Sequence, residues 1–164
     1  MRTIATYEQA VEFLYGRLDF ERMHSARYST RDFKLDRMRR LLQLMGDPQN
    51  QIPVVHIAGT KGKGSTAAMI AGILSAAGYR TGLFTSPHIA CVEERMQVDG
   101  VRPTPARFAD LINRLVEPIA QLDAQDDQLS PTFFEIVTAM GWLHFLDAEV
   151  DIVALEVGLG GRLD

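Results

Sequence analysis

Two kinds of apolar pattern alternate along the chain. Apolar residues recur every three or four positions in five segments, which predicts helices over 6–16, 35–45, 64–77, 104–122 and 132–148. Short runs of mostly apolar residues predict strands over 53–59, 81–86 and 151–157. Residues 92–98 are a further strand candidate, because they lead into a turn at Asp99-Gly100. The polar stretch 24–33 shows neither pattern and is predicted to be a loop.

Turn-forming residues mark the ends of these segments. Gly46 and Gly78 each follow a predicted helix, where a glycine favours the end of helical hydrogen bonding. Thr104 suits the position just before another helix begins, and Asp99-Gly100 predicts a tight turn after a strand.

Strands and helices alternate from residue 53 onward. The sequence therefore predicts an α/β fold with a mainly parallel sheet flanked by helices. Polar motifs follow three of the predicted strands: after Ala58, after Phe84 and at Glu156. Because ligands bind at the carboxyl ends of parallel strands, we expect these motifs to form the functional site.

The composition excludes several classes of protein. Hydrophobic residues make up 46% and charged residues 23% of the chain, typical of a globular domain, and the net charge of −4 argues against general nucleic-acid binding. No apolar run reaches the roughly 18 residues that span a bilayer, and the N-terminal residues lack the pattern of a secretory signal. The single cysteine, Cys91, excludes an internal disulfide and is expected to be an inert thiol. These features favour a cytoplasmic protein.

The segment GTKGKGS, Gly59 to Ser65, lies between a predicted strand and a predicted helix. Glycines there allow backbone N–H groups to surround a phosphate, and the positive end of the helix dipole adds to the attraction. Lys63 supplies a cation for the phosphates, and Ser65 and Thr66 supply hydroxyls at the helix start. The strict P-loop spacing is not met, because Gly64 separates Lys63 from Ser65. A glycine-rich turn without a ligand is the alternative interpretation.

Glu156 ends an apolar strand, and three glycines follow it closely. One carboxylate beside a phosphate loop suits Mg²⁺, which takes one or two protein carboxylates together with phosphates and waters. Ser86, at the end of another strand, is a candidate to bring a hydroxyl to the same ion. A solvated acid and an ordinary Ser-Pro turn are the alternatives.

Other conspicuous residues are interpreted as structural. Trp142 and Phe145 fit the core face of the last helix, and His56 is expected to be a hydrogen-bonded core histidine. A solvated helix face is expected for three arginines of the 35–45 segment, Arg37, Arg39 and Arg40.

Four motifs in this order carry a family resemblance: HIAGTKGKGST, TSPH, PTFFE and LEVGLGGRLD. Together they resemble the folylpolyglutamate synthase and dihydrofolate synthase family, the folate branch of the Mur-ligase-like ATP-dependent amide ligases. The resemblance implies that ATP phosphorylates a substrate carboxylate and that the amine of L-glutamate attacks the acyl phosphate to form an amide. It implies Mg²⁺ as cofactor, ATP, L-glutamate and dihydropteroate or reduced folate as partners, and a monomer that binds neither nucleic acid nor membrane.

The resemblance also assigns roles to residues of this chain. The ATP-binding loop comprises Gly59, Thr60, Lys61, Gly62, Lys63, Gly64, Ser65 and Thr66. Lys63 and Glu156 are the implied catalytic residues, and Ser86 and Glu156 the implied Mg²⁺ ligands. Two segments are implied to line the dihydropteroate pocket: Thr132, Phe133, Phe134 and Glu135, and then Leu163 and Asp164. An aromatic ring such as Phe134 suits stacking on a flat pterin, and a carboxylate such as Asp164 suits its N–H donors. From the residues alone, core packing of Phe133 and Phe134, and a helix-dipole role for Glu135, remain open.

The chain departs from the family pattern at two points. Lys61 stands where the family most often has Asn, and the chain ends at Asp164, before further ligands that the family carries. We therefore expect residues 1–52 to be a helical segment packing on the ATPase domain, residues 53–164 to be the first part of that domain, and a C-terminal domain to be absent. An isolated fragment of this kind is expected to be marginally stable and inactive. A Mur-type ligase of cell-wall precursors and a non-catalytic nucleotide-binding module are the alternatives.

Overall fold

The computed structural model describes residues 4–19, 35–158 and 161 of the 164-residue chain. The predicted loop over 24–33 and the candidate site residues Leu163 and Asp164 lie outside the described residues. The chain forms two compact units, the first from residues 1–47 and 104–140 and the second from residues 48–103 and 141–164. The assignment of 1–52 and 53–164 to parts of a larger enzyme stays a prediction.

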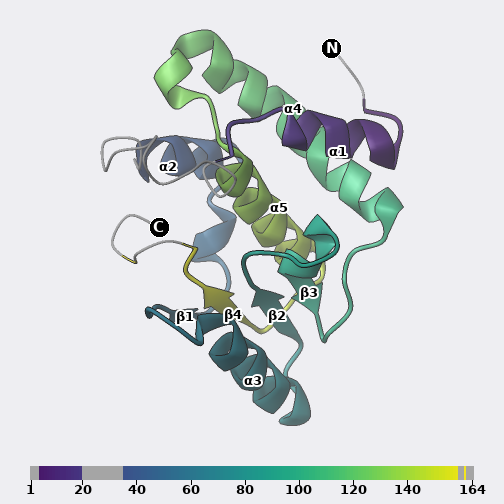
Figure 1. Ribbon diagram of the computed structural model, residues 1–164, viewed down its shortest axis with the longest axis vertical. Coiled ribbons are helices and arrows are strands. Elements are labelled where there is room, and N and C mark those ends of the chain that lie inside the picture. Colours follow the sequence, from purple (N-terminus) through teal and green to yellow (C-terminus); the bar gives the residue numbers. More distant parts are fainter. Residues whose placement is uncertain (1–3, 20–34, 159–160, 162–164) are drawn as a thin grey trace. The chain divides into compact units, whose positions relative to one another are not determined.

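Unit 1 is helical. It contains α1 (Tyr7–Tyr15), α2 (Leu35–Leu44), α4 (Pro105–Gln125), the short 3-10 helix η4 (Asp127–Leu129) and the first half of α5 (Phe133–Asp147). As predicted, Thr104 caps α4, because its side chain accepts a hydrogen bond from the Arg107 N–H. Helices α1 and α4 lie side by side (Figure 1), with the rings of Tyr7 and Phe108 5.5 Å apart.

Unit 2 is built around a sheet that has four strands in the described part of the chain. Its elements are η2 (Pro48–Asn50), β1 (Val54–Ile57), α3 (Lys63–Ala76), β2 (Thr81–Phe84), η3 (Val92–Arg95), β3 (Met96–Val98) and β4 (Ile152–Glu156). The strand order is β1-β4-β2-β3, in which β1, β4 and β2 are parallel and β3 is antiparallel to β2. The predicted α/β fold with a mainly parallel sheet is confirmed.

Small residues let α3 approach the sheet closely. Helix α3 lies beside the sheet (Figure 1). Ala67 and Ala71 of α3 are buried against Ile57 of β1 and Ala154 of β4. The second half of α5 also packs closely on the sheet, at Gly82 of β2. A methyl group added at Gly82 would lie only 2.9 Å from the Phe145 ring, so this contact requires glycine. Trp142 and Phe145 are buried, as predicted.

Two sequence expectations in unit 2 are wrong in detail. The predicted strand over 92–98 begins with the 3-10 turn η3, and only Met96–Val98 pair with β2. Val92 and Arg95 are both buried in this turned segment, an arrangement that strict strand alternation does not produce. His56 is exposed rather than a core residue, because β1 lies at an edge of the described sheet and Ile57 is its buried residue.

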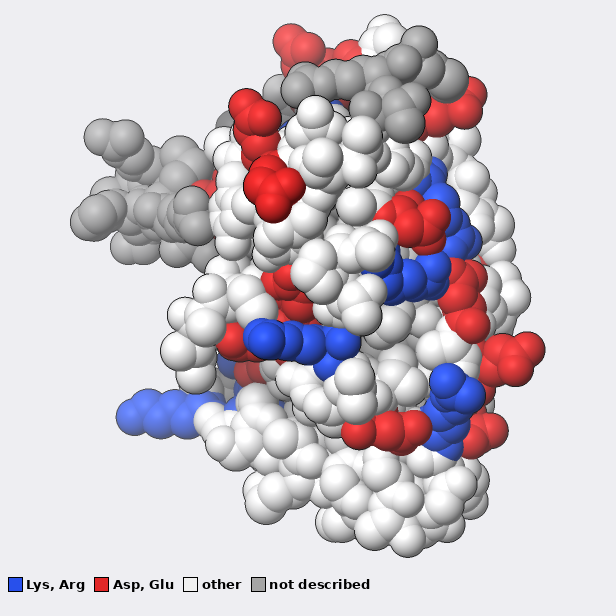
Figure 2. All heavy atoms as spheres, turned by 90° about the vertical axis from the view of Figure 1, so that its right-hand side faces the viewer, with Lys and Arg blue, Asp and Glu red and all other residues white. Residues whose placement is uncertain are grey.

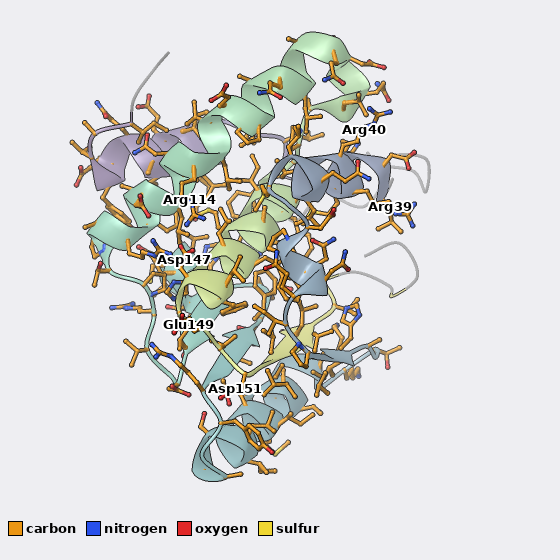
Figure 3. The ribbon with its side chains drawn as sticks, turned by 180° about the vertical axis from the view of Figure 1, so that it is seen from behind. Arg39, Arg40, Arg114, Asp147, Glu149 and Asp151 are labelled. Atoms are coloured by element: carbon orange, nitrogen blue, oxygen red, sulfur yellow. The ribbon has the colours of Figure 1, made fainter. Side chains whose placement is uncertain are left out.

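The surface mixes charges of both signs. Figure 2 shows blue and red side chains interspersed over one face, in keeping with the net charge of −4. Arg39 and Arg40 project from α2 (Figure 3), and the Arg39 side chain is 67% exposed. Within the described residues, no helix is both long enough and apolar enough to cross a membrane.

Candidate functional site

Three polar motifs meet at the carboxyl ends of the parallel strands of unit 2. The register places Ile57 of β1 opposite Glu156 of β4, and Phe84 of β2 opposite Leu155. The chain segments that leave β1 and β2 therefore start on either side of Glu156. This is the edge at which α/β sheets bind ligands.

The segment Gly59–Thr66 joins β1 to α3. Gly62 has a φ of 76°, in the left-handed region that favours glycine, and its carbonyl oxygen accepts hydrogen bonds from both the N–H and the hydroxyl of Thr66. Helix α3 begins at Lys63, one residue earlier than predicted. Gly59 to Gly62 are exposed, so the N-terminal end of α3 is accessible to solvent, as an anion site at a helix start requires.

Gly64 packs against the carboxylate of Glu156. A methyl group added at Gly64 would lie 3.0 Å from Glu156 Oε2, a tighter approach than almost all side chains make. The first turn of α3 and the end of β4 thus meet at van der Waals distance. The glycine that interrupts the strict P-loop spacing is the residue that makes room for this carboxylate.

Ser86 reaches Glu156 from the other side. Its N–H donates to Glu156 Oε2 at 2.9 Å, and the Ser86–Pro87 peptide bond is cis. Glu156 is only 5% exposed, and its Oε1 accepts no hydrogen bond from the described residues. A buried carboxylate with one oxygen fixed and the other without a partner is suited to accept a cation.

The arrangement combines groups that attract an anion with one that attracts a cation. The N-terminal end of α3 and the charge of Lys63 favour binding of a polyphosphate. The carboxylate of Glu156, which lies beside Ser86, favours binding of a divalent metal ion. The part of the chain that the structure describes holds no cluster of three acidic, histidine or cysteine residues. A metal here would therefore rest on one carboxylate with hydroxyl, phosphate and water ligands, which is the mode that Mg²⁺ favours.

The segment Thr132–Glu135 belongs to unit 1 and begins α5. The Thr132 hydroxyl accepts from the Glu135 N–H at 3.3 Å, and Glu135 Oε2 accepts from the Thr132 N–H at 2.8 Å. These reciprocal bonds form a capping box. Glu135 thus takes the first-turn role that the sequence left open.

Glu135 also forms a buried ion pair with Arg37 of α2. The Arg37 Nε donates to both carboxylate oxygens at 3.1 Å. The expectation that Arg37 lies on a solvated face with its neighbours is wrong: Arg37 is 8% exposed because helical geometry turns it toward α5, whereas Arg39 points outward.

The two phenylalanines of this segment differ in exposure. Phe133 is fully buried and stacks on Tyr15, with ring centroids 5.2 Å apart, so it packs in the core of unit 1. Phe134 is half-buried and retains an accessible surface. Of the four candidate pocket residues, Phe134 is the one that is not fully buried.

Sequence reasoning missed the residues that hold the candidate segments in place within each unit. Arg37 could not be distinguished in the sequence from the nearby arginines that lie on the surface. No local pattern connects it to Glu135, which is 98 residues away. Glu94 binds three backbone N–H groups of the segment that follows Ser86. The signal that could have found it is its place three residues after Cys91, the spacing of a carboxylate that caps the start of a helical turn.

The chain is similar in sequence and in fold to known folylpolyglutamate synthases. No family-level sequence profile matches the chain. The chain is 39% identical over 159 residues to dihydrofolate synthase/folylpolyglutamate synthase of Bacillus subtilis, a match that covers 96% of this chain and 35% of that protein. A folylpolyglutamate synthase of Mycobacterium tuberculosis, solved with ADP and AMPPCP, superposes with a TM-score of 0.84 at 35% identity over 99% of this chain and 34% of that one. A solved complex of FPGS with AMPPCP and folate has a TM-score of 0.84 at 31% identity over 98% of this chain and 37% of that one. The chain thus spans about a third of the length of the relatives it matches.

Proposed function

Because the chain belongs to the folylpolyglutamate synthase and dihydrofolate synthase family, we propose that its protein is an ATP-dependent ligase that adds L-glutamate to dihydropteroate or to folate polyglutamate. The observation that carries the proposal is the meeting of Gly64 and Ser86 at the carboxylate of Glu156. The related proteins are named for this activity, and one was solved with AMPPCP and folate. These names favour the folate branch over a ligase of cell-wall precursors.

The proposed phosphate-binding groups are those of Gly59–Thr66. Backbone N–H groups at the start of α3 bind the phosphate oxygens, and Lys63 in the first turn neutralises their charge. The exposed hydroxyls of Ser65 and Thr66 lie in the same turn. Lys61 adds a second exposed cation to the loop, and we assign it to ATP binding with the others.

Glu156 and Ser86 are the proposed Mg²⁺ ligands. The donor set fits the ion, because a carboxylate oxygen without a partner stands beside a serine at the phosphate-binding end of the sheet. When bound, Mg²⁺ would offset the charge that develops on the phosphates during transfer. The N–H of Ser86 holds Glu156 in place for this role.

The proposed reaction needs no protein nucleophile. The γ-phosphoryl group moves from ATP to an oxygen of the substrate carboxylate and ADP leaves; the glutamate amine then attacks the acyl carbon, phosphate leaves, and the amine loses a proton. Such chemistry depends on positioning and on charge neutralisation, which Lys63 and Glu156 provide. We name these two residues as catalytic for that reason.

For the acceptor, we propose Phe134 as the ring that stacks on the pterin, since its side chain is accessible where Phe133 is not. Thr132, Phe133 and Glu135 would then shape the pocket segment through the capping box and the core. Leu163 and Asp164 stay proposed members of the same pocket.

We also propose a cytoplasmic monomer. The reaction consumes ATP, and the one cysteine of the sequence, Cys91, is a free thiol in the structure, which suits a reducing compartment.

The test uses the protein encoded by the complete reading frame. It is incubated with MgATP, L-glutamate and dihydropteroate, and mass spectrometry is used to look for a product one glutamyl unit heavier. We expect the product with the native protein and with the control Glu117→Gln, an exposed acid on α4, and its loss in Lys63→Ala and Glu156→Gln. Glutamate addition to reduced folate alone would restrict the activity to tail extension, and ATP binding without either product would favour a non-catalytic module.

A further inference from the structure

The segment that carries Ser86 is a loop closed on itself. It runs from Thr85 to Arg95, between β2 and β3, and the Thr85 N–H donates to the Arg95 carbonyl oxygen at 3.1 Å. The next residues outward, Phe84 and Met96, are antiparallel partners in the sheet. The two ends of loop 85–95 are therefore fixed by the sheet, and side chains of the loop itself help to order what lies between them.

Glu94 organises the middle of loop 85–95. Its carboxylate accepts hydrogen bonds from three successive backbone N–H groups, those of Ile89 at 2.8 Å, Ala90 at 3.1 Å and Cys91 at 3.2 Å. The pKa of Glu94 is lowered, chiefly by the N–H of Ile89, so the carboxylate is ionised at neutral pH. Three charge-assisted bonds to consecutive amides fix the backbone just beyond the Ser86-Pro87-His88 turn.

Arg95 fixes the part of the loop closest to Ser86. Its guanidinium is buried, with the residue only 1% exposed, and Nε donates to Nδ1 of His88 at 2.9 Å. His88 lies two residues after Ser86, so this bond ties the turn to the base of the loop. Among the described residues, neither Glu94 nor Arg95 forms a hydrogen bond with Glu156.

We propose that Glu94 and Arg95 are positioning residues that hold Ser86 against Glu156 and thereby set the geometry of the proposed Mg²⁺ ligands. This inference rests on the proposed function for the identity of the ion. Groups that orient metal ligands from behind commonly change metal affinity by 10–100-fold when they are removed, on the order of magnitude measured in other metal sites. A merely structural role for the loop would leave metal affinity unchanged.

The experiment compares metal binding with loop order in the complete protein. The free Mn²⁺ signal in electron paramagnetic resonance reports the affinity for Mn²⁺ with ATP, and amide hydrogen exchange of the peptide over 86–91 reports the order of the loop. For Glu94→Gln we expect faster exchange in this peptide and a Kd for Mn²⁺ raised about tenfold. The control Glu117→Gln removes an exposed charge on α4 and should change neither measurement.

A second pair of variants tests Arg95 without removing its buried charge. His88→Ala deletes the acceptor of the Arg95 bond, whereas His88→Asn restores an acceptor oxygen near the place of Nδ1. We expect a raised Kd for Mn²⁺ in the first and at least partial recovery in the second.

The outcomes separate this inference from the proposed function. Faster loop exchange with an unchanged Kd for Mn²⁺ would overturn the positioning role and leave the proposed function standing. Changed Kd values in a protein that binds Mn²⁺ and ATP but makes no glutamylated product would support the positioning role and overturn the proposed reaction. A native protein that binds no Mn²⁺ in the presence of ATP would overturn both.

Discussion

Arg37 and Glu135 form a buried ion pair in which one nitrogen, Nε, donates to both carboxylate oxygens at 3.1 Å. Both side chains are about nine-tenths buried, and the same carboxylate completes the capping box with Thr132. The start of α5, where the proposed acceptor segment lies, is therefore held by a residue of α2. The pair connects the stability of unit 1 to the placement of Phe134.

Removing Arg37 should cost much more than removing its exposed neighbour. Arg37→Met leaves the Glu135 carboxylate buried with its strongest partner gone, so we expect the free energy of unfolding of unit 1 to fall by about 3 kcal/mol. Arg39→Met, which breaks only a 3.8 Å exposed contact with Asp36, should cost under about 0.5 kcal/mol. Urea denaturation of the two variants measures these free energies of unfolding. Equal decreases in the two variants would show that the buried ion pair stabilises the protein no more than the exposed contact does.

Gly64→Ala should weaken nucleotide binding. The added methyl group meets Glu156 Oε2 at 3.0 Å, so either the carboxylate or the first turn of α3 must shift, and we expect a loss of affinity for MgATP of about tenfold or more. Gly72→Ala in the same helix is the matched control, because a methyl group there meets nothing within 4 Å. Calorimetric titration with AMPPCP and Mg²⁺ distinguishes them; unchanged affinity in Gly64→Ala would contradict the close meeting of these groups.

Gly82→Ala should destabilise unit 2 by overpacking. The new methyl group would lie 2.9 Å from Phe145, in a contact between the sheet and α5 that has no room to relax, and we expect a loss of about 1–3 kcal/mol. Combining it with Phe145→Leu should recover part of that loss. Thermal unfolding of the single and double variants measures the coupling, and strictly additive losses would argue against the contact.

Cys91 should react slowly with alkylating reagents. Burial raises the pKa of the Cys91 thiol, the carboxylate of Glu93 raises it further, and Arg102, whose NH1 lies 3.0 Å from Sγ, acts in the opposite direction. At pH 7.5 the thiolate is therefore scarcer than in a free cysteine, and we expect alkylation by iodoacetamide to be slower than in an unstructured peptide.

Two comparisons check the origin of this slow reaction. The rate should climb with pH beyond the point where a model peptide levels off, and Arg102→Met should slow it further, because Arg102 is the neighbour that favours the thiolate. A rate equal to that of an unstructured peptide would contradict the raised pKa of the Cys91 thiol.

Local patterns predicted most of the helices and strands, although not the 3-10 turn Val92–Arg95, and they predicted that the site motifs lie together. Parallel strands end at one edge, so placing Glu156, Ser86 and the glycine-rich loop at strand ends already predicted that they lie together. The apolar pattern of residues 53–59 could not show that β1 lies at the edge of the described sheet. The burial of His56 was therefore predicted wrongly. Apolar runs record burial only on average, and strand order depends on pairing across the whole chain.

Long-range polar contacts were beyond the reach of the sequence. Arg37 and Arg39 are identical residues two positions apart, yet one is buried and the other exposed, and only the docking of α2 decides which. Glu94 is likewise one acid in a run of two, and its three bonds to backbone N–H groups follow from a turn that strand periodicity does not predict. The residues that we propose to bind ligands were therefore easier to predict than the residues that hold them in place.

The strand order also governs how the sheet can be made. β4 lies between β1 and β2, although it is the last of the four strands to be synthesised. A nascent chain that has made β1, α3, β2 and β3 can pair β2 with β3, but β1 has no partner until β4 is inserted between β1 and β2. That insertion brings Glu156 to Ser86 across 70 residues of sequence, a distant contact of the kind that slows folding. The loop around Gly62 can take shape early, but its partner carboxylate arrives only when the centre of the sheet is filled.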